Sequence, residues 1–496
     1  MILIRGGVIV DGTGAKPFTG DVAIKHNRIV AVGEKFPREH AEVIIDAKGG
    51  YVFPGFIDIN TESDHYLTLF TEPAQKTFLL QGVTTIIGGN CGTSLAPILS
   101  GTLEPFKKWT STDKINIGWH SVKELLNILR KQKLGVNFGT LVGYDTVRHE
   151  IAGDDSRDLT EKELAVVQKL VESGLKDGAF GLSAGLGHVP GKFVPYGELA
   201  KILESVREVK GIFSIHLRNE KEKLFESMRE AIRFADETRV TTLVSHFRPL
   251  KGFDSEFNKA LKAIEFASKR LQLYFDTYPF DTALVPISGL LPEWARHSTL
   301  REMLFHLSSH ETAKKIMDSF PAYSAKDITI IHADSAPYAI HKTIGEFAES
   351  RGLTISEGII ELMKVTKLRA AVLVRSVHMD LAIQSMASSR AIIASHAPSF
   401  HDSEHYARLS STFPTFIEIM EKTGIMKVES AIQKITSLPA KLLNIHDRGT
   451  IAVEKKADVT VMQNGKISHV IVNGTLAVED GTSLGTLKGT ILEHES

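Results

Sequence analysis

The single cysteine of the chain and two of its histidines stand where strand-like runs end. Ile212-Phe-Ser-Ile-His216 and Thr242-Leu-Val-Ser-His246 each finish an apolar run on a histidine, and Cys91 follows the run Val83-Thr-Thr-Ile-Ile87. A thiolate and two imidazoles that converge on one point form a three-ligand zinc site with an open fourth position, the arrangement of catalytic zinc. The pattern therefore points to a zinc ion held by Cys91, His216 and His246.

Each of these residues also has an ordinary structural interpretation. A lone cysteine is most often a small buried hydrophobic residue. With 20 histidines in the chain, some will simply form hydrogen bonds near a strand end. The coincidence of three such residues at three strand ends favours the metal site.

The elements that must position these side chains alternate between strand and helix through the middle of the chain. Apolar strand candidates fall at 56–59, 83–87, 136–142, 180–183, 212–215, 242–245, 271–275 and 391–395. The segments 196–210, 221–238 and 256–270 carry apolar residues at helical spacing among charged ones. A strand and a helix recur about every 30 residues, which predicts a (β/α)8 barrel over residues 54–445. In such barrels the chemistry lies at the carboxyl ends of the strands.

Both ends of the chain consist of short β-branched runs separated by turn residues. In the second of them, Ser468-His-Val-Ile-Val472 and Thr475-Leu-Ala-Val478 flank the turn Asn473-Gly474. We expect residues 1–53 and 446–496 to combine into one small β-sandwich beside the barrel. The segment 289–345 is too long for one barrel connection and is rich in helix-like sequence, which predicts an insertion on the barrel.

The overall composition excludes several classes of protein. The 496 residues are 43% hydrophobic and 24% charged, which is typical of a folded protein. The formal charge of −1 offers no electrostatic case for nucleic acid or an anionic membrane as partner. No apolar run approaches the ~18 residues of a membrane-spanning helix, and the N-terminal run Met1-Ile-Leu-Ile-Arg-Gly-Gly lacks a signal-peptide pattern. We expect a cytoplasmic protein with a small-molecule substrate, and the oligomeric state is left open.

Several longer motifs carry a resemblance to a known family. They are Tyr51-Val-Phe-Pro-Gly-Phe-Ile-Asp58, Gln81-Gly-Val-Thr-Thr85, Gly89-Asn-Cys-Gly-Thr-Ser-Leu-Ala-Pro97, Gly178-Ala-Phe-Gly-Leu-Ser-Ala-Gly-Leu186, His216-Leu-Arg-Asn-Glu220, Ser245-His246, Asp276-Thr-Tyr-Pro279, Thr436-Ser-Leu-Pro-Ala440 and Asp447-Arg-Gly449. With them the chain resembles the D-aminoacylase (N-acyl-D-amino-acid deacylase) branch of the amidohydrolase superfamily over nearly its whole length.

The resemblance implies a fold, a metal site and a substrate site. The fold is a (β/α)8 barrel with a β-domain from both termini and an insertion on the barrel. The tight zinc site of the family matches Cys91, His216 and His246. Arg248 and Tyr278 match the residues that hold the substrate's carboxylate, a group that arginine can bind bidentately.

Two positions depart from the family pattern. The first barrel strand of the family normally ends in His-x-His, which supplies a second, weaker metal position, whereas Asn60 and Glu62 stand there in this chain. The last barrel strand normally ends in Ser-Asp-Gly, whose aspartate is the general acid/base, whereas this chain reads Ser395-His396-Ala397. A second metal ion is therefore doubtful, and the usual proton carrier is replaced.

Two residues are candidates for the missing proton carrier. His396 can act as a general base near neutral pH, or it can close the site as a fourth metal ligand. Glu62, with Asp64 beside it, is the other candidate base, although such a carboxylate pair is often solvated surface.

Three functions follow from these residues. The first is a zinc-dependent hydrolase that cleaves the amide bond of N-acyl amino acids of D configuration through metal-activated water. The second is an amidohydrolase-like zinc-binding protein that has lost catalysis and acts as a binding module, because both departures fall on functional positions. The third is a hydrolase of cyclic amides like the hydantoinases, which generally use a carboxylated lysine that no strand end offers here.

Overall fold

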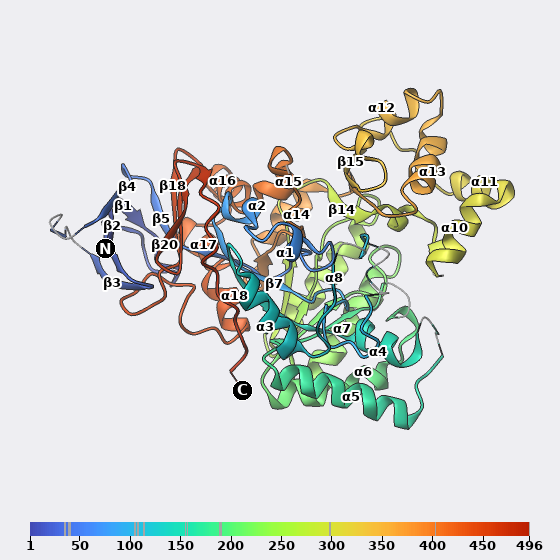
Figure 1. The fold of residues 1–496 in the computed structure, drawn as a ribbon, viewed down its shortest axis with the longest axis horizontal. Coiled ribbons are helices and arrows are strands. Elements are labelled where there is room, and N and C mark those ends of the chain that lie inside the picture. Colours follow the sequence, from blue (N-terminus) through green and yellow to red (C-terminus); the bar gives the residue numbers. More distant parts are fainter. Residues whose placement is uncertain are drawn as a thin grey trace.

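The computed structural model describes residues 1–33, 36–37, 41–103, 106, 109–112, 115–153, 155, 157–187, 191–296, 299–401 and 403–495. These residues form three units that Figure 1 shows from one side. A sheet made from both ends of the chain lies at the left, the barrel lies at the lower centre, and an inserted unit stands at the upper right (Figure 1).

Parallel strands form the centre of the molecule. They are β6 (Phe56–Asp58), β7 (Val83–Gly88), β8 (Asn137–Thr140) continued by β9 (Val142–Gly143), β10 (Gly181–Gly185), β11 (Ile212–His216), β12 (Thr241–Val244), β13 (Leu273–Thr277) and β17 (Ala391–Ile393). They pair in chain order from β6 to β8 and from β9 to β17. The ring closes where the His396 amide donates to the Asn60 carbonyl at 2.9 Å. All eight predicted strands are present, and they form the (β/α)8 barrel that the sequence predicts.

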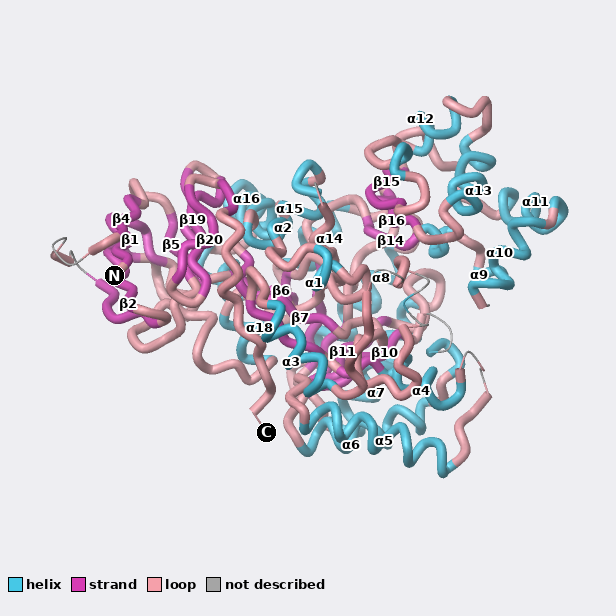
Figure 2. Tube along the Cα trace, viewed as in Figure 1, coloured by secondary structure: helices cyan, strands magenta, loops and turns pink. Residues whose placement is uncertain are grey.

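Helices cover the outside of this ring (Figure 2). They include α3 (Val122–Gln132), α4 (Tyr144–Ala152), α5 (Glu161–Lys176), α6 (Tyr196–Glu208), α7 (Leu224–Thr238), α8 (Asp254–Ala267), α14 (Met379–Met386) and α16 (Thr412–Thr423), with the shorter α1 (Thr68–Thr71), α2 (Lys76–Leu79), α15 (Ala407–Ser410) and α17 (Val428–Gln433). α5 begins at a capping box, in which the Thr160 hydroxyl accepts from the Glu163 amide. α6, α7 and α8 follow the three predicted helical segments closely.

Apolar side chains close the end of the barrel opposite to the strand carboxyl ends. Phe180 and Ile212 inside the ring pack in one cluster with Leu442 and Leu443 from the end of α18 (Ser437–Leu442). The last segment of the chain also joins the wall, because the Phe138 amide donates to the Thr490 carbonyl and the Leu492 amide donates to the Phe138 carbonyl. Local sequence patterns do not reveal this contribution of the tail.

The two ends of the chain share one mixed sheet. Its strands are β1 (Ile2–Ile9), β2 (Phe18–Lys25), β3 (Arg28–Gly33), β4 (Val43–Asp46), β5 (Tyr51–Pro54), β18 (Val459–Gln463), β19 (Lys466–Val472), β20 (Thr475–Glu479) and β21 (Thr482–Ser483). The order is β21-β20-β19-β18-β5-β1-β2-β3, and β4 also pairs with β1. The register of β1 shifts between Ile4 and Gly7, which lets β4 and β5 pair with successive halves of the same strand. β5 and β18 join the two ends by antiparallel pairing.

The inserted unit has a small sheet and its own core. β14 (Ala283–Pro286), β16 (Ala370–Val374) and β15 (Ile328–Ala333) pair antiparallel in that order. The helices are α9 (Glu293–Arg296), α10 (Leu300–Ser308), α11 (His310–Asp318), α12 (Ile344–Glu349) and α13 (Ile355–Val365). The unit extends beyond the expected range 289–345 on both sides, because β14 and β16 close it by pairing with each other.

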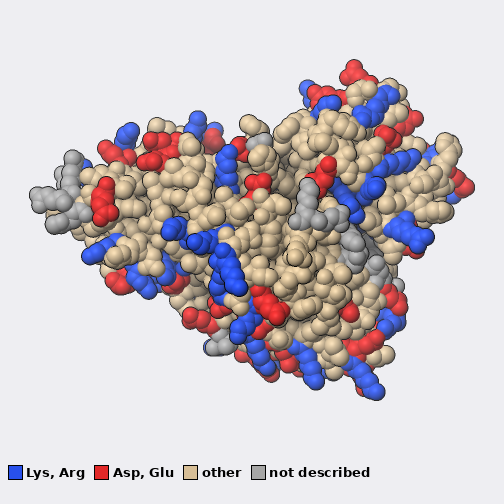
Figure 3. Space-filling model, viewed as in Figure 1, with Lys and Arg blue, Asp and Glu red and all other residues tan. Residues whose placement is uncertain are grey.

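The surface carries no dominant charge on the face that Figure 3 shows, where basic and acidic side chains are interspersed. This distribution agrees with the formal charge of −1. In the described part of the chain, no helix combines the length and the apolar character needed to cross a membrane.

Candidate active site and metal centre

The candidate ligands lie in the loops that follow the barrel strands. His216 is the last residue of β11, and His246 follows the end of β12 by two residues. Cys91 follows the end of β7 by three residues, and His396 follows the end of β17 by three. All four side chains are buried. The ring of parallel strands therefore brings together side chains from four separate parts of the chain, as expected for the carboxyl face of a barrel.

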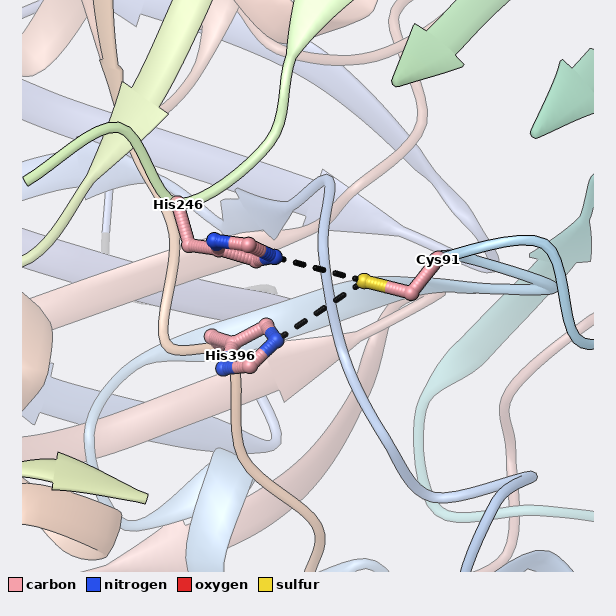
Figure 4. Close-up of side chains that lie close together, drawn as sticks. All are labelled: Cys91, His246 and His396. Carbon is pink, nitrogen blue, oxygen red and sulfur yellow. Dashed lines mark hydrogen bonds between the residues drawn. The ribbon is translucent and has the colours of Figure 1, made fainter. Parts of the chain in front are cut away.

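Three donor atoms converge on one point. Figure 4 shows the Cys91 thiol facing the imidazoles of both His246 and His396. The Cys91 Sγ lies 3.5 Å from His246 Nε2 and 3.9 Å from His396 Nε2. Donor atoms of these three residues all lie within 4.8 Å of one another.

These spacings match a tetrahedral metal site. With Zn–S near 2.3 Å and Zn–N near 2.0–2.1 Å, a tetrahedral angle separates sulfur and nitrogen by about 3.6 Å. The two observed separations, 3.5 and 3.9 Å, lie close to that value. One thiol and two imidazoles are also donors that favour zinc over cations that prefer oxygen ligands. The residues present therefore fit a bound zinc ion.

His216 belongs to a second group that shares His246. His216 Nε2 lies 4.0 Å from Glu220 Oε2, and the rings of His216 and His246 meet edge to face with centres 4.4 Å apart. The predicted combination of Cys91, His216 and His246 is not among the groups of described residues whose donor atoms all lie within 4.8 Å. The structure thus divides the predicted ligands between two overlapping groups.

Burial disfavours the charged forms of His216, His396 and Cys91 in the absence of a cation. It lowers the pKa of His216 to about 3 and, with the charges of nearby cationic groups, lowers the pKa of His396 well below its usual range. Burial also raises the pKa of the Cys91 thiol, and the Glu62 carboxylate raises it further. Neutral imidazole is the form that binds metal, whereas the thiol ionises when a cation is beside it. Metal binding here must therefore release the thiol proton.

A salt bridge behind the site orients His246. Arg248 donates from Nη1 to Glu220 Oε1 at 3.1 Å and from Nη2 to Oε2 at 3.2 Å. Burial raises the pKa of Glu220, but Arg248 and the two neighbouring histidines outweigh it, so the pKa lies well below its usual range. Glu220 Oε1 lies 3.0 Å from His246 Nδ1, and an N–H directed at this carboxylate leaves the Nε2 lone pair for Cys91 or a metal. Arg248 Nη1 also donates to the His246 carbonyl at 2.9 Å, which holds the guanidinium beside the His246 loop.

Glu62 is an interior carboxylate beside His396. Its Oε1 lies 3.2 Å from His396 Nε2, and its side chain is only 4% exposed. Burial raises the pKa of Glu62 to about 8, against the opposing charges of Arg408 and Arg248. Glu62 Oε2 has no hydrogen-bond partner among the described residues. The carboxylate is therefore not part of the solvated surface.

Tyr278 lies behind the site. It is buried and does not line the cavity described below. The guanidinium of Arg408 lies 3.9 Å from the centre of the Tyr278 ring, and its Nε donates to the Thr282 carbonyl at 3.2 Å. Arg408 is not recognisable from the sequence, because nothing in its local pattern distinguishes it from other helical arginines.

A cavity of about 450 Å³ opens in front of these residues. The barrel wall presents Glu62, Cys91, His216, His246 and His396 to it, and the inserted unit contributes an apolar wall that includes Val285, Leu290, Pro321, Tyr323 and Val374. Cationic side chains also line it, among them Lys192, Arg218 and Arg296. Ligand donors and an apolar wall thus face each other across a space large enough for a small molecule.

The backbone is unusual at three of the four candidate ligands. Cys91, His246 and His396 have φ values of 51°, 37° and 46°, in the left-handed region that non-glycine residues seldom adopt. His216 has no such conformation and pairs regularly with Gly185 in β10. Such conformations cost about 1–3 kcal/mol each and concentrate at functional sites.

Comparison with known proteins finds similarity to amidohydrolases. The Amidohydrolase family profile matches residues 328–477. D-aminoacylase from Alcaligenes xylosoxydans xylosoxydans is 26% identical over 470 residues, which are 94% of this chain and 89% of that protein. N-acyl-D-aspartate deacylase from the same organism is 34% identical over 257 residues, which are 50% of this chain and 49% of that protein.

Solved structures of similar proteins share the fold of this chain. The crystal structure of D-aminoacylase superposes with a TM-score of 0.80 at 24% identity, covering 99% of each chain. The resemblance to the D-aminoacylase branch is confirmed. N-acyl-D-glutamate deacylase from Bordetella bronchiseptica, solved with zinc and a phosphonate that mimics the tetrahedral intermediate, reaches a TM-score of 0.79 at 22% identity, again over 99% of each chain. A further D-aminoacylase structure is described as having a binuclear metal centre.

Proposed function

We propose that the chain is a zinc-dependent hydrolase that cleaves the amide bond of N-acyl amino acids of D configuration. The observation that carries the proposal is the convergence of a buried thiol and buried imidazoles at the mouth of the barrel, facing the cavity. The names of the relatives, which are deacylases of D-amino acid derivatives, supply the substrate class.

The metal would be held by Cys91 and His246 together with a further imidazole, from His216 or His396. When bound, a divalent cation polarises the amide carbonyl and lowers the pKa of water. Glu220 and Arg248 keep the His246 ring in place. Glu62 and His396 are the candidates to take a proton from the attacking water and deliver it to the leaving amine.

The substrate's carboxylate requires a cation on the cavity wall. The resemblance assigns this role to Arg248 and Tyr278, but Arg248 directs both terminal nitrogens at Glu220, and Tyr278 does not line the cavity. Arg296 of α9 does line it, and its buried Nε has no hydrogen-bond partner among the described residues. A guanidinium can hold a carboxylate through two parallel hydrogen bonds. We therefore assign the carboxylate contact to Arg296 and a positioning role to Arg248.

The first test is turnover by zinc-reconstituted protein of a panel of N-acetyl and N-formyl D- and L-amino acids, measured as released amine. We expect turnover of the D series. Binding of the panel without turnover, with one zinc per chain, would instead support the alternative of a binding module.

The second test concerns the carboxylate contact. We expect Arg296→Gln to raise KM for N-acyl amino acids by at least tenfold with a smaller change in kcat. Lys221→Gln, at the rim of the same cavity, is the matched control and is expected to change KM by less than threefold. Equal effects of the two substitutions would exclude a specific contact with Arg296.

A further inference from the structure

We propose that His396, and not His216, is the third metal ligand of this chain, and that Glu62 takes the place of the missing proton carrier. The ligand assignment concerns metal binding and stands apart from turnover. The role of Glu62 rests on the function proposed above.

The distances favour His396 over His216. His396 Nε2 faces the Cys91 thiol at 3.9 Å and shares a compact group with His246, whereas His216 Nε2 faces Glu220 at 4.0 Å. The backbone of Gly187 also confines His216, because a Cβ at that position would lie 2.4 Å from its Nε2. The His216 ring is thus held against Gly187 and Glu220, at the edge of His246.

The backbone makes the same distinction. Cys91, His246 and His396 follow their strands and themselves have positive φ. They are also the three residues whose donor atoms converge. His216 ends β11 in regular pairing. Three residues that follow three different strands thus share a backbone conformation that is costly for non-glycine residues. This shared cost indicates that their side chains are required to converge on one metal ion.

The two departures from the family pattern compensate each other. The family pattern places histidines at the end of the first barrel strand and a carboxylate at the end of the last, whereas this chain has Glu62 at the first place and His396 at the second. These strand ends are neighbours, because the His396 amide donates to the Asn60 carbonyl and the Glu62 amide donates to the Ala397 carbonyl. Relative to the family pattern, the histidine ligand and the carboxylate have exchanged places between the first and the last barrel strand. The site therefore still contains one histidine and one carboxylate at these two strand ends.

This exchange assigns the proton transfer to Glu62. A metal-bound His396 uses its Nε2 lone pair and cannot take a proton there, whereas Glu62 lies beside it and is one of the residues that line the cavity. The second oxygen of Glu62, Oε2, is buried and has no hydrogen-bond partner among the described residues. Glu62 would accept a proton from the attacking water as the water oxygen bonds to the amide carbon. It would return that proton to the nitrogen as the C–N bond breaks, so that an amine and a carboxylic acid leave.

The ligand assignment is tested by metal binding alone. Wild type, His396→Ala, His216→Ala and the matched control His469→Ala, whose histidine lies in β19 of the terminal sheet, are compared by zinc competition with a chelator and by the absorption of the cobalt-substituted proteins. We expect His396→Ala to weaken zinc binding at least 100-fold and to change the cobalt spectrum. His216→Ala is expected to weaken binding by less than tenfold, and His469→Ala to leave it unchanged. Zinc loss in His216→Ala with zinc retained in His396→Ala would overturn the assignment, and thermal unfolding of each metal-free variant identifies any that fail to fold.

The role of Glu62 is tested on zinc-loaded protein. We expect Glu62→Gln to keep zinc affinity within threefold and to lower kcat at least 100-fold with little change in KM. Retained turnover in zinc-loaded Glu62→Gln would overturn the role of Glu62. Absence of turnover in the wild type, with zinc bound through His396, would overturn the proposed function while supporting the ligand assignment.

Discussion

The two ends of the barrel are equally buried and are built from opposite kinds of side chain. At the carboxyl ends of the strands, Asp58, Glu62, Asp276 and His246 are almost fully enclosed by protein. At the opposite end the interior is filled by apolar residues such as Phe180, Ile212, Leu442 and Leu443. Burial by itself therefore does not show whether a residue serves stability or activity. The polar or apolar character of the buried side chain shows it.

The polar end is costly to fold and the apolar end stabilises the fold. Burial raises the pKa of Asp58 to about 7 and that of Glu62 to about 8, which shows that the carboxylate forms are disfavoured there. The positive φ values of Cys91, His246 and His396 add further cost. The apolar end has no such cost, because each enclosed side chain gains by leaving water.

The largest effect expected from this comparison is on activity at the polar end. Cys91→Ser is expected to lower kcat/KM at least 1,000-fold through loss of zinc, measured by turnover and by metal content. The melting temperature of the metal-free protein should stay within a few degrees of the wild-type value, because serine is close to cysteine in size and its hydroxyl can keep the hydrogen bonds to His246 and His396. A fall in metal-free stability as large as that caused by a substitution at the apolar end would break the comparison.

The opposite result is expected at the apolar end. Leu443→Ala removes a fully buried side chain and is expected to lower the free energy of unfolding by about 2–5 kcal/mol, measured by urea denaturation. Turnover per folded molecule should be unchanged, because Leu443 belongs to the cluster that fills the barrel interior and does not line the cavity. Loss of zinc in this variant would contradict the separation of the two ends.

The pH dependence of stability sharpens the comparison further. Glu62 has a folded pKa of about 8, above its unfolded value, so the folded state binds its proton more tightly. The contribution of this group to stability is present at low pH and is lost as pH rises through about 8. The contribution of Glu62 to the stability of the metal-free protein is therefore expected to fall between about pH 5 and 8, by up to about 1.4 kcal/mol per pH unit. Glu62→Gln should flatten this dependence, and an identical slope in the two proteins would show that Glu62 is ionised when buried.

The smallest effect is expected on the outside of the barrel. Phe266 at the end of α8 is 72% exposed, and Phe266→Ser is expected to change the free energy of unfolding by less than about 0.5 kcal/mol and to leave turnover unchanged. Urea denaturation and the amine-release assay measure both quantities. A larger destabilisation would show that this side chain is covered in solution.

The fold was predictable from the sequence because each strand and helix of the barrel has a recognisable local pattern. Each strand is a short apolar run, and polar residues such as His246 that follow such runs fall at one end of a parallel barrel. The bounds of the insertion were less accessible, because β14 and β16 are paired across a long stretch of chain that local patterns do not connect. The terminal tail beside β8 was missed for the same reason.

The choice among the histidines was beyond local patterns. His216 and His396 both follow apolar runs, and the difference between them lies in the φ angle of each residue and in what surrounds each ring. The pairing of Arg248 with Glu220 joins two loops, so the sequence offers no spacing that would reveal it. The assignments of Cys91, His216, His246, His396, Glu62, Arg248 and Tyr278 stay predictions that the experiments above distinguish.

The pairing of β5 with β18 has a consequence for synthesis on the ribosome. Val52 reaches its partner Val461 only after about 400 further residues have been made, which takes about 20–80 s at about 5–20 residues per second. During that interval the edge of β5 has free amide and carbonyl groups and an apolar face that includes Phe53. Unpaired edges of this kind readily join other chains. We therefore expect nascent copies on one messenger to associate through β5, and a chaperone that shields it until release to raise the yield of folded protein.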